Sequence, residues 1–196
     1  MNHRKHCTKK PVSPEHQAGF TLIELIVTLA IAAIVLTQGI PSFWTTIQNN
    51  KISTTTNDLV GDINLARSEA ISRGVTVTLC RSDNPQAGAS CGNAGAWNTG
   101  WLIYADDDNS GDFDPANDTL IRIGQPVSNT ITLSSSAGVT GISYSSNGLT
   151  SSAATAVFAF CDSRGVDYGN ELRVNTTGRP RLTRGSPTAP LTSCTP

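Results

Sequence analysis

The stretch Gly19-Phe20-Thr21-Leu22-Ile23-Glu24-Leu25 decides the fold of the N-terminal part of this chain. It joins a basic leader to a long apolar run, and it places one carboxylate, Glu24, near the start of that run. A carboxylate inside a membrane span costs a few kcal/mol, and such residues are by default functional. The stretch therefore predicts a membrane helix whose first turn has a task beyond anchoring.

The leader, residues 1–19, is basic. An ordinary secretory signal is cleaved after its apolar region. Here the best-matching site, between Gly19 and Phe20, comes before that region, so we expect the span to remain in the mature protein. An uncleaved signal anchor is the alternative. Positive charge on this side of the span holds it in the cytoplasm, and the charges are Arg4, Lys5, Lys9 and Lys10 against Glu15.

One long helix should follow the cleavage site. The 21 residues from Phe20 to Ile40 are mostly apolar and would rise about 30 Å, one bilayer core. Pro41 should kink or loosen the helix. A buried stripe at alternating spacings of four and three then predicts an amphipathic stalk: Ile52, Thr56, Leu59, Ile63, Ala66 and Ala70. Arg73-Gly74 is typical of a helix end, so we predict a transmembrane helix over 20–41 and a stalk over 42–73.

The N-terminal stretch resembles the signal of type IV pilins and pseudopilins. In these proteins a prepilin peptidase cuts after the glycine and methylates the new N-terminal phenylalanine, which implies processing at Gly19 and Phe20. The resemblance also implies that Glu24 pairs with the methylated amine of Phe20, its own or that of an adjacent subunit. The attraction between the two charges offsets the free-energy cost of burying each of them. A protonated Glu24 without a partner is the alternative.

Residue types limit the chemistry of the mature chain. All three histidines, His3, His6 and His16, lie in the leader, and the one lysine after it is Lys51. These counts exclude His-based triads, Cys-His dyads and His-ligated zinc. We therefore expect that the protein is not an enzyme.

Four cysteines follow the leader: Cys80, Cys91, Cys161 and Cys194. An even number in an exported domain predicts two disulfides, with three possible connectivities. We prefer Cys80–Cys91, which closes a Gly/Ala/Asn-rich loop, and Cys161–Cys194, which ties the C-terminal tail to a strand. A zinc site of four thiolates is the alternative, although the spacing lacks a C-x₂₋₄-C pair.

After Gly74 the pattern changes to the alternation of β-strands. The turn signals Asn147-Gly148 and Thr177-Gly178 separate some of these runs. Residues 74–196 should form one antiparallel β domain. The expected fold is α+β and pilin-like, with a long N-terminal helix packed on an antiparallel sheet. The expected strands cover residues 75–79, 101–105, 119–123, 129–133, 141–145, 155–160, 171–174 and 179–183.

Three segments of this domain resemble the GspH/FimT group of minor pseudopilins. They are residues 100–104 before an Asp-rich loop, residues 142–148, and residues 160–162 with 175–181. Gly178-Arg179-Pro180-Arg181 is similar to the G-R-x-R element of the FimT branch. In that branch the element is associated with DNA binding during natural transformation, which implies a DNA-binding role here.

The charge distribution agrees with a localised DNA site. After the leader there are 10 Lys/Arg and 14 Asp/Glu, so the whole surface is not basic. From Leu172 onward the chain has no acidic residue and four arginines: Arg173, Arg179, Arg181 and Arg184. Arginine grips phosphate with two donors, and Gly178 would permit close backbone approach. No aromatic residue stands beside these arginines in the sequence, so we expect non-specific binding to duplex DNA. A solvated strand face, or one that pairs with a neighbouring pilin, is the alternative.

The Asp-rich loop offers a candidate calcium site. Its oxygen donors fall at alternate positions, with Gly111 at the sixth position of the calcium-loop template. The closing glutamate is replaced by Asn117, and a plain Asp/Asn/Gly turn explains the loop as well. We expect no cofactor, with calcium as the open alternative. The candidate ligands are Asp106, Asp108, Ser110, Asp112 and Asp114.

Together these features predict a minor type IV pilin that binds DNA for natural transformation through a C-terminal arginine patch. A GspH-like minor pseudopilin with a structural role in type II secretion is the alternative. The expected location is the inner membrane, with a single pass, a periplasmic domain and surface exposure in an assembled pilus. The expected partners are other pilins, the prepilin peptidase, the membrane and double-stranded DNA.

Overall fold

The computed structural model describes residues 19–92, 96–136, 138–151 and 155–185. The chain divides into two compact units, residues 1–43 and 44–196. Helix α1, Leu22–Arg73, contributes to both and continues through position 41. Its N-terminal part is long and apolar enough to cross a membrane, and its large apolar side chains there are exposed.

In the second unit, the C-terminal half of α1 is the centre around which the domain folds. The six residues of the expected stripe are all at most 2% exposed, which confirms the period-based prediction. The helix ends at Arg73, and Gly74 takes a φ of 73°, a left-handed conformation that glycine tolerates. The sequence therefore identified both the buried face and the end of the helix.

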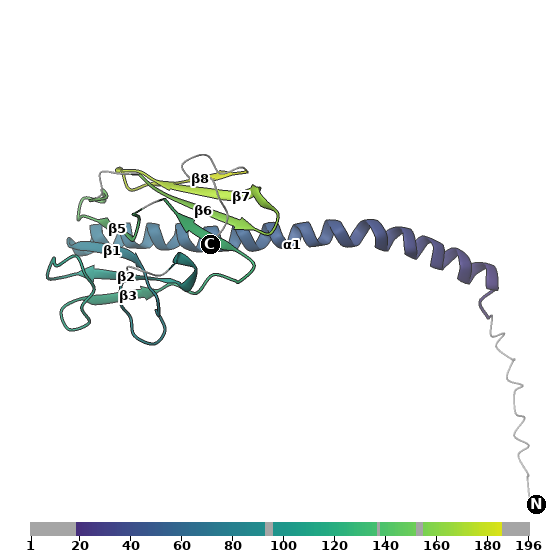
Figure 1. The fold of residues 1–196 in the computed structure, drawn as a ribbon, viewed down its shortest axis with the longest axis horizontal. Helices are drawn as coiled ribbons and strands as arrows, with labels where there is room; N and C mark the ends of the chain where they lie inside the picture. The colour runs from purple at the N-terminus through teal and green to yellow at the C-terminus, as the bar shows by residue number, and fades with distance from the viewer. Residues whose placement is uncertain (1–18, 93–95, 137, 152–154, 186–196) are drawn as a thin grey trace, which may run out of the picture. The chain divides into compact units, whose positions relative to one another are not determined.

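Two antiparallel four-stranded sheets lie on two sides of this half of α1 (Figure 1). The first sheet has the order β3-β2-β1-β5 and the second has the order β4-β6-β7-β8. The first is built from β1 (Thr76–Arg81), β2 (Trp101–Asp106), β3 (Thr119–Ile123) and β5 (Gly141–Tyr144). The second is built from β4 (Thr132–Ser135), β6 (Ala156–Asp162), β7 (Gly165–Val174) and β8 (Pro180–Arg184). The predicted α+β fold class is confirmed.

The core of the domain lies between the helix and the inner faces of the two sheets. Leu59 and Ile63 of α1 belong to one buried cluster with Ile103 of β2 and Phe158 of β6. Phe158 makes an edge-to-face contact with Trp97, with ring centroids 4.9 Å apart. Trp97 opens a short 3₁₀ helix, η1 (Trp97–Thr99), between β1 and β2.

The starts of two strands differ from the predictions by more than one residue. Strand β4 starts at Thr132 rather than at residue 129, because a turn in which the Ile131 amide donates to the Ser128 carbonyl uses the preceding residues. Strand β7 starts at Gly165, six residues before the predicted start. Its first half carries polar and exposed side chains, so hydrophobic alternation did not reveal it. The early start brings Tyr168 into the hairpin with β6.

The predicted Cys80–Cys91 disulfide is present, with Cα atoms 5.6 Å apart. It links β1 to the loop that leads to η1. Cys161 is disulfide-bonded as well, and its predicted partner Cys194 lies outside the described residues.

Candidate functional site

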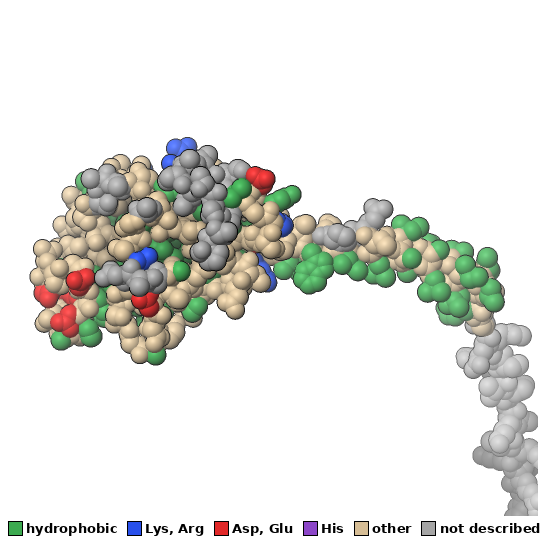
Figure 2. All heavy atoms as spheres, in the orientation of Figure 1, with side chains coloured by type: hydrophobic (Ala, Val, Ile, Leu, Met, Phe, Trp, Pro, Cys, Tyr) green, Lys and Arg blue, Asp and Glu red, His purple; other side chains and the backbone are tan. Residues whose placement is uncertain are grey.

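Strand β8, at one edge of its sheet, carries the arginines that the sequence singled out. Its register pairs Leu182 with Leu172 and Arg181 with Arg173. Leu172 is fully buried against the core, so Arg181 and Arg173 project to the opposite face of the sheet. Arg179, which precedes the strand, is exposed like Arg181. Figure 2 shows basic side chains at the top of the domain, near β8, with one acidic side chain to their right, while most of the acidic side chains lie at the lower left.

The arginines on this face differ in how their charge is balanced. Arg173 forms an ion pair with the buried carboxylate of Glu171. In the described part of the chain, no carboxylate pairs with Arg179 or Arg181. Arg179 and Arg181 therefore supply exposed positive charge that no carboxylate of the described residues balances. The charge of Arg173 is balanced by Glu171.

The structure does not bring Arg184 onto the same face. Arg184 pairs in register with Asn170, a buried residue whose Nδ2 donates to Thr56 Oγ1 of α1 at 3.2 Å. Arg184 consequently lies on the helix side of β8, where it lines a cavity of about 290 Å³ together with Ser53 and Tyr168. The expected patch of four arginines therefore divides between two faces of the sheet.

An aromatic residue does lie beside an arginine, contrary to the sequence-based expectation. Tyr168 lines the same cavity as Arg184, and Arg164 stacks over its ring at 4.7 Å. Arg164 is held by Asp162, whose carboxylate accepts from its guanidinium at 2.7–3.1 Å. Burial tends to raise the pKa of Asp162, but the Arg164 hydrogen bonds and charge outweigh it and hold that pKa below its usual value. Tyr168 was missed because sixteen residues separate it from Arg184 and only the strand register joins them.

Gly178 has a different role from the expected one. It is buried and has a φ of 74°. A Cβ at this position would lie 2.6 Å from the Gly148 carbonyl oxygen and 2.7 Å from Cε1 of Tyr144. The Tyr144 hydroxyl donates to the Gly178 carbonyl oxygen at 3.1 Å, and burial raises the pKa of that phenol. The close backbone approach that Gly178 permits is thus to the protein's own turn at Gly148.

The Asp-rich loop between β2 and β3 is held by its own backbone donors. Asp106 is 4% exposed and accepts from the amides of Ser110, at 2.9 Å, and Gly111, at 3.1 Å. Asp118 accepts from the amides of Asp107, at 3.1 Å, and Asp114, at 2.8 Å. These hydrogen bonds organise the loop as a polar turn.

The carboxylates that the loop brings together differ from the calcium-loop template. Oxygens of Asp106, Asp108 and Asp118 lie within 4.8 Å of one another. Asp114 instead accepts from the Ala116 amide at 2.9 Å, in a turn of its own. Burial raises the pKa of Asp106, and hydrogen bonds from Ser110 lower that of Asp108. Because backbone amides already donate to the carboxylates of Asp106 and Asp118, we propose that the loop binds no cofactor.

The first turn of α1 contains Glu24. Its backbone amide donates to Thr21 Oγ1 at 3.3 Å, so Thr21 acts as the N-cap of the helix. Thr21 and Glu24 have the spacing of a capping box, a signal that the sequence reasoning missed. A carboxylate in the first turn also complements the helix dipole. Glu24 and Phe20 are both exposed, and both are accessible to a partner.

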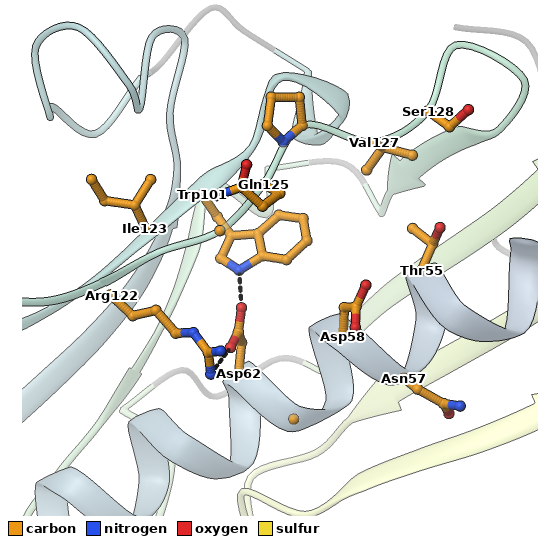
Figure 3. Close-up of a pocket in the computed structure, with 13 residues that line it drawn as sticks. Thr55, Asn57, Asp58, Asp62, Trp101, Arg122, Ile123, Gln125, Val127 and Ser128 are labelled. Carbon is orange, nitrogen blue, oxygen red and sulfur yellow. Dashed lines mark hydrogen bonds and ion pairs between the residues drawn. The ribbon is translucent and has the colours of Figure 1, made fainter.

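A buried carboxylate on α1 is a further polar site that the sequence reasoning missed (Figure 3). Asp62 is 5% exposed and accepts from Trp101 Nε1 at 2.7 Å. It also pairs with Arg122 at 3.0 Å. Burial raises the pKa of Asp62, and the Trp101 hydrogen bond and the Arg122 charge offset this only in part.

This carboxylate connects three elements of the domain, because Asp62 belongs to α1, Trp101 to β2 and Arg122 to β3. A cavity of about 490 Å³ adjoins it. The hydrogen bond from Trp101 and the ion pair with Arg122 tie α1 to both strands, so we assign the Asp62 group a structural role. Its sequence signal was an aspartate beside Ile63 in the buried stripe.

Comparisons with known proteins agree with this fold. A family model described as type II transport protein GspH matches residues 55–178, and a prokaryotic N-terminal methylation motif matches residues 16–37. No curated protein sequence matches the chain.

Two solved structures have the same fold. Both are crystal structures of the type IV minor pilin FimU of Pseudomonas aeruginosa, in space groups P21 and P65, and both are 20% identical to this chain. The first has a TM-score of 0.56 and covers 76% of this chain and 98% of FimU. The second has a TM-score of 0.55 and covers 73% of this chain and 99% of FimU.

Proposed function

Because this chain belongs to the family of type II transport protein GspH, we propose that it is a minor type IV pilin that binds DNA through Arg179 and Arg181. The N-terminal methylation motif supports processing by a prepilin peptidase at Gly19 and Phe20 and assembly with other pilins. The apolar part of α1 anchors the protein in the inner membrane, and we infer that the β domain lies in the periplasm and reaches the cell surface in a pilus.

The single observation that carries the DNA proposal is the unbalanced charge at the edge of β8. Arg179 and Arg181 are exposed and have no carboxylate partner among the described residues, in a mature chain that is acidic overall. Arginine side chains in this setting bind phosphate oxygens. Arg173 is already paired with Glu171, so we assign it a supporting role.

Arg184 can join the phosphate contacts only from the other face of the edge strand. There it lines one cavity with Tyr168, whose ring is stacked by Arg164. Gly178 positions the arginines through its turn. The assembly therefore supports binding to the DNA backbone without sequence preference.

The test is a fluorescence anisotropy titration of residues 20–196 in detergent with duplex DNA. We expect micromolar binding whose log-log dependence on salt has a slope of about −2 to −3, since two or three phosphates are contacted. Arg179→Ala/Arg181→Ala should weaken binding by about tenfold or more, because each lost phosphate contact removes a large share of the electrostatic term.

A control variant removes the same charge elsewhere. Lys51→Ala/Arg73→Ala also loses two cations, both on α1, and should bind DNA nearly as the wild type does. An equal loss of DNA affinity in both double variants would show that the net charge of the protein, and not the position of the arginines, determines binding. No binding by the wild-type protein would leave a structural pseudopilin of type II secretion as the function, which is the second candidate that the GspH family match favours.

For assembly we propose that Glu24 pairs with the methylated amine of Phe20 in the filament. Removing one partner of a desolvated ion pair costs about 3–5 kcal/mol, so Glu24→Ala should lower incorporation into filaments by more than tenfold. The variant should still enter the membrane and be cleaved. Immunoblots of sheared filaments and membranes would measure both, with Glu69→Ala on the stalk as a control. Normal incorporation of Glu24→Ala would contradict the pairing.

A further inference from the structure

Trp44, the first residue of the second unit, lies within α1 and has an exposed aromatic side chain. Trp44 is 60% exposed, whereas Trp97 and Trp101 are each 2% exposed. Tryptophan carries 150–250 Å² of mostly apolar surface, and in soluble domains it is largely buried. An exposed tryptophan at this place therefore needs a partner.

The surroundings of Trp44 are amphipathic. Ile47 and Lys51 follow it on the same side of α1, and the three line a cavity of about 450 Å³ together with Ile131, polar residues of the β domain and Asp162, whose charge is paired with Arg164. Helix side chains lean toward the N-terminus, which on α1 is the direction from Lys51 to Trp44. The surface combines an apolar ring with the one cation between Phe20 and Asp58.

The position of this surface along the chain identifies the occupant. Trp44 follows Phe20 by 24 residues, which correspond to about 36 Å of helix. A bilayer measures about 30 Å across its hydrocarbon core and about 40–45 Å with its headgroups. The apolar run from Phe20 to Ile40 is long enough for one hydrocarbon core, so Trp44, four residues after that run, belongs to the stretch of chain that leaves the core at headgroup level.

We propose that Trp44, Ile47 and Lys51 bind the headgroup region of the anionic phospholipid bilayer before the subunit is assembled. Tryptophan rings prefer this layer, and a lysine that points toward the bilayer extends its ammonium group to lipid phosphates. The contact fixes the depth of the span and so holds Glu24 at the opposite interface. This inference does not depend on DNA binding.

The test uses residues 20–196 in phosphatidylcholine/phosphatidylglycerol vesicles, with bromine placed either high on the acyl chains or near their terminal methyl groups. Bromine placed high on the acyl chains should quench the emission of one of the three tryptophans, Trp44. Bromine near the terminal methyl groups should quench it less. Trp44→Phe should remove the quenching, since Trp97 and Trp101 are buried.

A positional control moves the fluorophore. Leu149 is 45% exposed and adjoins Gly148, whose carbonyl oxygen accepts from Arg67 far along α1. The Trp44→Phe/Leu149→Trp protein should show no quenching. Lys51→Gln should reduce the dependence of Trp44 emission on phosphatidylglycerol, whereas Arg73→Gln should not.

Several results would overturn the proposal. These are the absence of shallow quenching, stronger quenching by deep bromine, or an unchanged lipid dependence in Lys51→Gln. Emission that is insensitive to brominated lipid but shifts with protein concentration would assign the surface to a second copy of the chain instead.

Discussion

Replacing Asp62 with alanine is expected to lower the free energy of unfolding by about 2–4 kcal/mol. The carboxylate is 5% exposed and accepts the indole N–H of Trp101 at 2.7 Å. Alanine would leave that donor buried and unpaired and would open a void between α1 and β2. Arg122 has a side chain that is 56% exposed, so it can regain water and adds little to the cost.

The Asp62→Asn variant separates the hydrogen bond from the charge. Its amide oxygen can still accept from Trp101, and a neutral group avoids the desolvation of a carboxylate. We expect this variant to lose about 1 kcal/mol or less at neutral pH. A loss as large as that of Asp62→Ala would show that the ion pair with Arg122 matters more than the indole contact.

The pH dependence of the wild type relative to Asp62→Asn follows from the raised pKa of Asp62. The folded state binds the proton more tightly than the unfolded state, whose value is 3.8. The contribution of Asp62 to stability is therefore fully present below that pH and is lost as the pH rises through the folded pKa. Urea titrations across this range should show the wild type losing stability relative to Asp62→Asn as the pH increases, and the opposite slope would contradict the assignment.

The parts of the fold that the sequence predicted are those set by local periodicity. The helical stripe from Ile52 to Ala70 was visible because a helix repeats every 3.6 residues, and Gly74 marked its end. Strand β3 was located at the observed residues, 119–123, because it lies between clear turn signals. Strand β7 was recognised only in its buried half, since the residues near Tyr168 are polar or exposed.

The parts of the candidate site that the sequence did not predict depend on register and on distant contacts. Arg179 and Arg181 were identified from the Gly-Arg-Pro-Arg element and from the absence of acidic residues after Leu172, but the face of Arg184 follows from its pairing with Asn170. The Asp62–Trp101 hydrogen bond joins residues 39 positions apart, and no local pattern signals it. Tyr168 and Arg184 likewise line one cavity although they belong to two neighbouring strands.

The family match and the exposed arginines each restrict the function in a different way. Membership of the GspH family and the methylation motif account for the membrane helix and for assembly with other pilins. They do not require a basic strand, and the overall acidity of the mature chain makes one less expected. The exposed Arg179 and Arg181 are therefore the feature on which the DNA-binding and the structural candidates differ.

Substitution of Gly178 by alanine is expected to destabilise the domain by about 2–5 kcal/mol. A left-handed conformation, here with a φ of 74°, costs a non-glycine residue about 1–2 kcal/mol. The added Cβ would also lie 2.6 Å from the Gly148 oxygen and 2.7 Å from the Tyr144 ring, and such overpacking costs about 1–3 kcal/mol. Denaturant unfolding measures the loss.

Gly185→Ala is the matched control for this prediction. Gly185 has a φ of 100°, but a Cβ there meets nothing within 4 Å, so only the backbone cost of about 1–2 kcal/mol applies. A larger loss in Gly178→Ala means that the glycine of the Gly-Arg-Pro-Arg element serves to seat the β7–β8 turn against Gly148 and Tyr144. If Gly178→Ala instead weakened DNA binding while unfolding like the control, the glycine would be acting at the DNA surface, and our structural assignment would be wrong.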